Sequence, residues 1–183
     1  MSSRRVPILM GLLLAAGAGA AQAAAPPKPP RLTALLPAKN KVPGCAKLFV
    51  PPEDFEDPCA GTVKGNPQSS TEPHYVACRA SLLVGLSKAE GVKAEQASEA
   101  AAVTYEAGAE MSVLAVAFAD EQAATAVSAG LEQTSGVKPP SGPARALVFR
   151  SGSAVAFASC DAEFDAACCR QMLAAVAATW KKP

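Results

Sequence analysis

The spacing of hydrophobic side chains predicts a helix near the middle of the chain. Val76, Ala80 and Leu83 fall on one face of a helix drawn over residues 72–88, and Gly91 follows as a stop signal. Two further leucines lie close to this apolar face: Leu82 and Leu86. The pattern therefore predicts a helix that packs one side against the rest of the protein.

The second half of the chain changes to short β-rich runs that alternate with helical stretches. The pentapeptide AVAFA occurs at 115–119 and again at 154–158. Each copy follows a run in which Gly separates two β-rich stretches, and each precedes an acidic residue that opens an Ala-rich helix. This shared order predicts two ββα units, at about 97–133 and 145–180. A chance repeat is the alternative, because Ala-rich strands recur easily in such a chain.

Two such hairpins can join into one antiparallel sheet. We therefore expect an α+β fold in which the two ββα units form a sheet of about four strands. The helices are expected on one face of this sheet, because each must bury an apolar stripe. The segment KLFV at 47–50 is a candidate edge strand. Proline and glycine interrupt residues 42–74 too often for long elements, so loops are expected there.

The first residues have the pattern of a secretory signal peptide. A positive start at Arg4 and Arg5 is followed by an uncharged apolar run and by an A-x-A cleavage site that ends at Ala23. We predict a signal peptide over 1–23. A transmembrane anchor is the alternative, but the apolar run is short and dominated by Ala and Gly. The sequence leaves open whether export uses the Sec or the twin-arginine route.

A proline-rich stretch separates the predicted signal peptide from the folded part. Prolines favour extended backbone and oppose helix, which is typical of a linker. We therefore expect a linker over 24–41 and a single α+β domain over 42–183. About 160 residues remain after the cut, the usual size of one domain. No later segment is long and apolar enough to span a membrane.

The charge balance argues against nucleic acid as a partner. The chain has 17 basic and 16 acidic residues, and the predicted signal peptide holds two of the basic ones. The remaining chain is thus near neutral, and no basic run interleaves with aromatic residues. Nucleic-acid binding therefore has no electrostatic support. The heavy use of Ala, Gly and Pro suggests a bacterial source.

All six cysteines lie after the predicted signal peptide. An even number of cysteines in an exported protein predicts disulfides, although the sequence does not choose among the pairings. Such bonds would staple the domain, mainly by restricting the unfolded chain. The disulfide candidates are Cys45, Cys59, Cys78, Cys160, Cys168 and Cys169.

The two cysteines of the last helix need different partners. Cys168 and Cys169 lie at the two flanks of its apolar side and point in diverging directions. A bond between them would be strained in a helix. We expect Cys160, at the end of the preceding strand, to pair with one of them and Cys78 with the other. A third bond, Cys45–Cys59, would then close a loop.

The sequence offers no recognisable catalytic residue. His74 is the only histidine, and its setting TEPH is typical of a helix start at the surface. No nucleophile motif accompanies it. The cysteines lack the C-x-x-C spacing of exported oxidoreductases and the paired spacing of zinc sites. We therefore expect no metal site and no cofactor, and we interpret the protein as a non-enzyme.

Acidic residues gather in the loop PPEDFEDP and at the start of the last helix. Phe55 stands among the carboxylates of the loop and is a candidate anchor or partner contact. These carboxylates are expected to be solvated: Glu53, Asp54, Glu56 and Asp57. The acidic residues before the last helix are expected to cap it. A calcium site is the alternative there, but the Gly-punctuated loop of calcium motifs is missing.

Together these features indicate an exported, non-enzymatic, disulfide-stabilised binding or interaction domain of a bacterial cell envelope. Its location would be periplasmic or secreted. Its partner would be an unknown protein, an envelope component or a small apolar ligand. The alternative is a thiol-redox or metal-binding protein, which would use Cys168, Cys169, Cys78 and His74. A purely structural envelope protein is a third hypothesis.

Overall fold

The computed structural model describes residues 32–37, 39–52, 55–59, 61–62, 68–134, 136–139 and 141–180. The predicted signal peptide over 1–23 and the first part of the predicted linker lie outside the described residues. Two residues of the acidic loop, Glu53 and Asp54, also lie outside them. Within the described part of the chain, no helix combines the length and hydropathy that crossing a bilayer requires.

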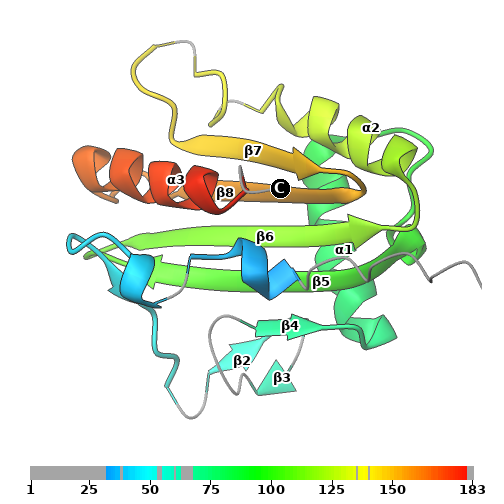
Figure 1. Cartoon of the computed structure of the whole chain (residues 1–183), viewed down its shortest axis with the longest axis horizontal. Coiled ribbons are helices and arrows are strands. Elements are labelled where there is room, and N and C mark those ends of the chain that lie inside the picture. The colour runs from blue at the N-terminus through cyan, green and yellow to red at the C-terminus, as the bar shows by residue number, and fades with distance from the viewer. Residues whose placement is uncertain are drawn as a thin grey trace, which may run out of the picture.

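One antiparallel sheet forms the centre of the molecule (Figure 1). Its strands are β1 (Lys47–Leu48), β4 (Gln68–Ser70), β5 (Ala97–Glu106), β6 (Glu110–Phe118), β7 (Ala146–Ser151) and β8 (Ala154–Cys160). The strand order is β1-β5-β6-β8-β7, and β4 pairs with the same edge of β5 as β1. A small separate hairpin joins β2 (Glu56–Asp57) to β3 (Gly61–Thr62).

The two predicted ββα units are present, and the α+β fold class is confirmed. The hairpin β5–β6 leads into α2 (Glu121–Leu131), and the hairpin β7–β8 leads into α3 (Ala166–Trp180). The two AVAFA copies lie side by side in the middle of the sheet, where Ala115 pairs with Ala156. The β5–β6 turn is favoured by Gly108, whose φ of 77° few other residues adopt.

The strand count is larger than the four that we expected, because β1 and β4 extend the sheet beyond the two hairpins. Each of these strands has only two or three residues. Such a short strand gives no alternating pattern in the sequence. The candidate edge strand KLFV is therefore present in part, as β1.

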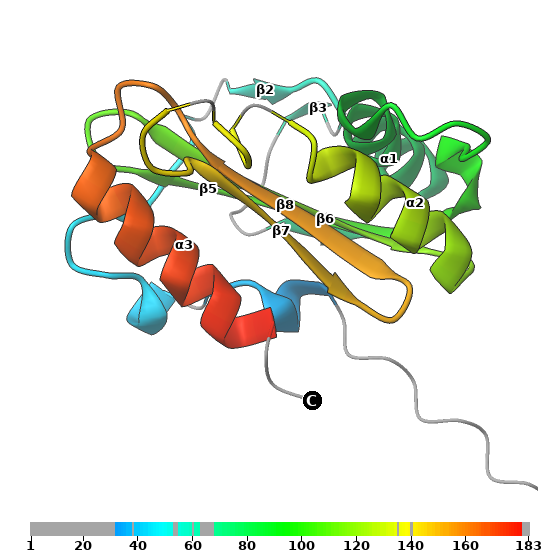
Figure 2. The same cartoon turned by 90° about the horizontal axis from the view of Figure 1, so that it is seen from above.

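The expectation that the helices share one face of the sheet is wrong. Figure 2 shows α1 (Pro73–Ser87) and α2 on one face and α3 on the other, beside the short turn η1 (Leu32–Leu35). The strands allow this because both of their faces are apolar: Val113 packs on the α3 side and Val116 on the α1 and α2 side. Cys160 points to the α3 side, and its bond to Cys169 holds α3 there.

Part of the segment expected to be a linker packs onto the α3 face. Leu32 and Leu36 are buried in the same core cluster as α3. The hydroxyl of Thr179 donates to the carbonyl of Leu35 at 2.6 Å, and the hydroxyl of Tyr105 donates to the carbonyl of Pro37 at 3.2 Å. A second short turn, η2, follows at Lys39–Lys41.

The two helices on the other face approach each other closely. The helix predicted over 72–88 is α1, and Lys88 ends it with a left-handed φ of 53°. A third turn, η3 (Ala94–Gln96), connects α1 to β5. Gly130 of α2 lies against the end of α1, where a Cβ atom would stand 2.0 Å from the carbonyl oxygen of Ser87. This contact fixes how closely the two helices pack.

Candidate functional site

All six cysteines form disulfides, which confirms that the fold is disulfide-stapled. The pairs are Cys45–Cys168, Cys59–Cys78 and Cys160–Cys169. Cys168 and Cys169 have different partners, as their positions on α3 indicated, and Cys160 is one of these partners.

The other two expected pairings are wrong. Cys78 does not reach α3, because α1 and α3 lie on opposite faces of the sheet. It bonds to Cys59 in the segment beside α1 instead. Cys45 precedes β1 and pairs with Cys168 at the start of α3. The loop closure Cys45–Cys59 therefore does not form.

The residues of the alternative thiol or metal site are not brought together. His74 lies exposed at the start of α1, and Cys78 lies one turn further along the same helix. Cys168 and Cys169 lie on the other face of the sheet, and all three sulfurs are in disulfides. Among the described residues, no group of three metal-ligating side chains is close enough to hold an ion.

An apolar groove lies beside α1, and we call it the α1 groove. Its volume is about 410 Å³. One wall is formed by α1 through Leu82 and Leu86, which are 49% and 51% exposed. The floor is the half of the sheet that α1 and α2 leave open. The opposite wall is a segment that we call the arm, comprising residues 49–52 and 55–59.

The floor of the α1 groove changes from apolar to polar along the strands. Alternate residues of β5, β6 and β8 point to this face, so neighbours in register form rows across the sheet. The apolar row holds Ala102, Leu114 and Phe157. The hydroxyl row holds Thr104, Ser112 and Ser159. The carboxylate row, beside the β5–β6 turn, holds Glu106 and Glu110.

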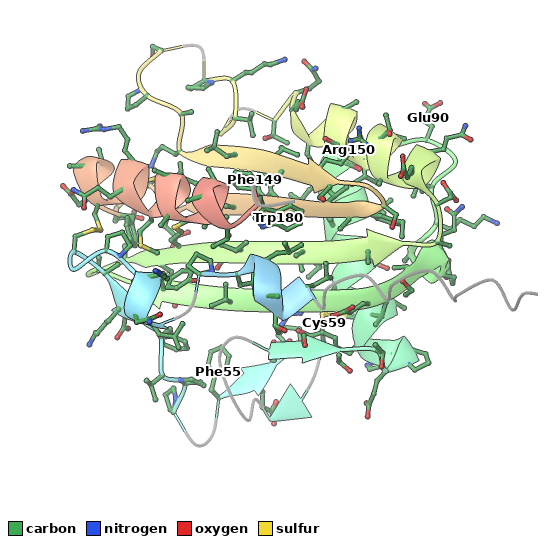
Figure 3. All side chains as sticks on the ribbon, viewed as in Figure 1. Phe55, Cys59, Glu90, Phe149, Arg150 and Trp180 are labelled. Atoms are coloured by element: carbon green, nitrogen blue, oxygen red, sulfur yellow. A yellow bond between two sulfur atoms is a disulfide. The ribbon has the colours of Figure 1, made fainter. Side chains whose placement is uncertain are left out.

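The arm supplies aromatic side chains to the groove. The backbone N–H of Phe49 donates to the carbonyl of Thr104 at 3.0 Å, which ties the start of the arm to β5. The rings of Phe49 and Phe55 meet edge to face, with centroids 5.7 Å apart. Figure 3 shows Phe55 and Cys59 on the same side of the sheet as the β2–β3 hairpin. Phe55 thus anchors the arm and lines the groove, while 40% of it stays exposed.

Two bonds fix the arm to α1. The disulfide Cys59–Cys78 is the covalent one. The other is an ion pair in which Arg79 donates to Asp57, whose second oxygen accepts from the backbone N–H of Cys59 at 2.7 Å. Asp57 is only 8% exposed, so the expectation that it is solvated is wrong, whereas Glu56 is exposed as expected.

The ion pair also shapes the charge of the groove. The guanidinium of Arg79 lies over the ring of Tyr75, 5.3 Å from its centroid. Burial raises the pKa of the Tyr75 phenol, and the neighbouring Arg79 offsets part of that rise. Because Asp57 neutralises Arg79, this wall of the groove carries no net charge.

The sequence alone does not identify the groove. Leu82 and Leu86 stand out only as leucines next to the buried stripe of α1, which gives no sign that they are exposed. The arm residues stand far from the strands in sequence and reach them only through the fold. Phe55 is the one groove residue that the sequence suggests, as an aromatic side chain within an acidic loop.

Comparison with protein-family models, with curated protein sequences and with solved structures gives no significant match to this chain. The three disulfides fit a stabilised domain of an extracellular or otherwise oxidising compartment.

Proposed function

We propose that this protein is an exported, non-enzymatic binding domain of a bacterial envelope, and that the α1 groove binds a small apolar ligand. A volume of about 410 Å³ falls within the range of small-molecule sites, roughly 300–1,000 Å³. The lining is mainly apolar with a few polar groups at one end, which is the usual composition of such sites. The disulfides and the predicted signal peptide support a periplasmic or secreted location.

The observation that carries this proposal is the exposure of large apolar side chains around a preformed hollow. Leu82, Leu86 and Phe55 would each lose contact with water on contacting a ligand. The arm is held by a disulfide and a buried ion pair, so the wall is formed before any ligand arrives. A preformed wall lowers the ordering cost of binding.

Binding is supported better than catalysis by the groups that line the groove. The described lining contains no histidine and no free thiol, and the Asp57 carboxylate is engaged with Arg79. The remaining polar groups are hydroxyls and the exposed carboxylate of Glu110. Such groups orient a ligand but do not make an activated nucleophile with its base.

Titration with N-phenyl-1-naphthylamine, a neutral apolar fluorophore, tests this function. We expect saturable binding with a blue-shifted, enhanced emission. The double variant Leu82→Gln/Leu86→Gln should weaken the affinity by roughly tenfold or more, because each half-exposed leucine contributes about 1 kcal/mol of apolar burial. Gln keeps the length and the helix propensity of Leu, so α1 should remain intact.

The matched control is Val50→Gln. Val50 belongs to the arm, but its side chain is 79% exposed and is not among those that line the groove, so its replacement should leave the affinity unchanged. Circular dichroism and the melting temperature should be alike for both variants and the parent protein. The groove would be refuted as the binding site if the parent protein did not bind the dye. It would also be refuted if the double leucine variant bound the dye as tightly as the parent.

A further inference from the structure

The α1 groove has a polarity gradient that selects the shape of its ligand. The apolar row and the carboxylate row are four residues apart on each of β5 and β6, which is about 13 Å at ~3.3 Å per residue. The hydroxyl row lies between them. A molecule lying along the strands would therefore meet apolar carbon first, then hydroxyl oxygens, then carboxylate.

The charge at the polar end is negative. Glu110 lines the groove, and among the described residues it forms no ion pair. Glu106 stands opposite it in the hairpin and is paired with Lys47 at 2.9 Å. The backbone N–H of Asp161 donates to the carbonyl of Glu110 at 2.9 Å, so a further acidic residue directly adjoins the polar end.

The positive charge in the groove wall, on Arg79, already has a negative partner. Arg79 is paired with Asp57 and also covers the ring of Tyr75. A carboxylate ligand would have to compete with Asp57 for it. At the polar end, the same ligand would face the exposed carboxylate of Glu110, and the cation in that row, Lys47, is already paired with Glu106.

Resting on the proposed function, we propose that the α1 groove binds amphipathic amines: molecules with an apolar chain of about 13 Å and a cationic head. The chain runs along the strands and its far end reaches the apolar row between α1 and the arm. The ammonium head donates to the hydroxyl row and pairs with Glu110. Among ligands with the same alkyl chain, the one with a positive head should bind most tightly, because its charge complements the exposed carboxylate of Glu110.

Isothermal titration calorimetry with three ligands of one chain length tests this inference: decylamine, decanol and decanoate at pH 7. We expect decylamine to bind several-fold more tightly than decanol and at least tenfold more tightly than decanoate. The preference should shrink as salt is raised, because an exposed charge pair is screened. Glu110→Gln removes both the attraction for the amine and the repulsion of the carboxylate, each worth a few-fold at an exposed site, so the three affinities should then lie within about threefold of one another.

Glu90→Gln is the matched control, because it removes the same charge from the opposite end of the sheet, where Figure 3 places Glu90. It should leave the preference for decylamine intact. A preference for decanoate, or a decylamine preference that Glu110→Gln leaves unchanged, would overturn the amine assignment while leaving the groove as an apolar site.

Two other outcomes would overturn the proposed small-ligand function as well as the amine assignment. No heat with any of the three ligands would overturn both the amine assignment and the small-ligand function. In analytical ultracentrifugation, a dimer that the pair Leu82→Gln/Leu86→Gln abolishes would show that a second copy of the chain fills the groove. That result would also overturn the proposal.

Discussion

At the scale of single residues, the two tyrosines report on the integrity of the core. Tyr105 is fully buried, and burial raises the pKa of its phenol well above the ordinary value of 10.0. Burial also raises the pKa of Tyr75, although Arg79 limits the rise. The chain has no other tyrosine. Phenol absorbance therefore follows these two sites alone.

We expect neither phenol to ionise in the folded protein near pH 10. Above that pH the unfolded chain loses its phenol protons first, so it binds fewer protons than the native state and stability falls as pH rises. Absorbance at 295 nm should increase only together with the loss of circular dichroism. In concentrated urea both phenols should titrate near the ordinary value. Two ionisations near pH 10 with native circular dichroism would contradict the burial of these rings.

Asp57 shows why residue roles were partly hidden in the sequence. Its neighbours in the chain are acidic and its local setting is a loop, so solvation is the natural expectation. Its partner Arg79 is 22 positions away, on a helix. The expectation for Asp57 fails because a carboxylate can be buried when an opposite charge pairs with it in the folded structure. The local sequence around Asp57 does not show that Arg79 is this partner.

At the scale of elements, two helical glycines should respond oppositely to the same substitution, because Gly130 lies at the α1–α2 contact and Gly85 does not. Gly130→Ala should destabilise the protein by about 1–3 kcal/mol, because the new methyl group meets the backbone of Ser87 and the helices must separate. Gly85→Ala should stabilise it by about 0.5–1 kcal/mol, because a Cβ there meets nothing and Ala favours the helix. Urea unfolding of both variants measures the difference.

The two substitutions control for each other, because both add the same methyl group to a helix. Equal effects would show that helix propensity alone decides and that α1 and α2 are not in close contact. Dye binding serves as a second readout for Gly130→Ala, since a moved α1 also moves the wall formed by Leu82 and Leu86.

Elements with a clear period were predicted well from the sequence. The hairpins at 97–118 and 146–160 and their helices have alternating or helical patterns long enough to recognise. The side of the sheet that α3 covers was not predictable, because the strands are apolar on both faces. β1 and β4 were too short to show a period, and the groove depends on the arm reaching α1. That contact is made by Cys59–Cys78 and by Arg79, which no local pattern indicates.

At the scale of the whole molecule, the three disulfides should differ in their stabilising effect. Cys45–Cys168 joins positions 123 residues apart, whereas Cys160–Cys169 joins positions 9 apart. In the chain-entropy description, removing the first should cost about 5 kcal/mol and removing the second about 2.5 kcal/mol. The variants Cys45→Ala/Cys168→Ala and Cys160→Ala/Cys169→Ala test this by urea unfolding.

Each variant replaces one buried cysteine of α3 on the same face of the sheet, Cys168 or Cys169. The partners differ, because Cys160 is also buried there whereas Cys45 is exposed. Mass spectrometry after alkylation should find no free thiol in either variant. If the short bond proves as costly as the long one, local packing around α3 rather than restriction of the unfolded chain sets its contribution.

The order of these cysteines along the chain also bears on how the protein matures during synthesis. Cys45 emerges together with Cys59 and Cys78, but its native partner follows it by 123 residues. If the cysteines oxidise in the order in which they are synthesised, Cys45 therefore forms a non-native disulfide with Cys59 or Cys78. Release from such a bond requires attack by another thiolate. Correct maturation thus depends on an isomerase, or on oxidation that waits until α3 has reached the sheet.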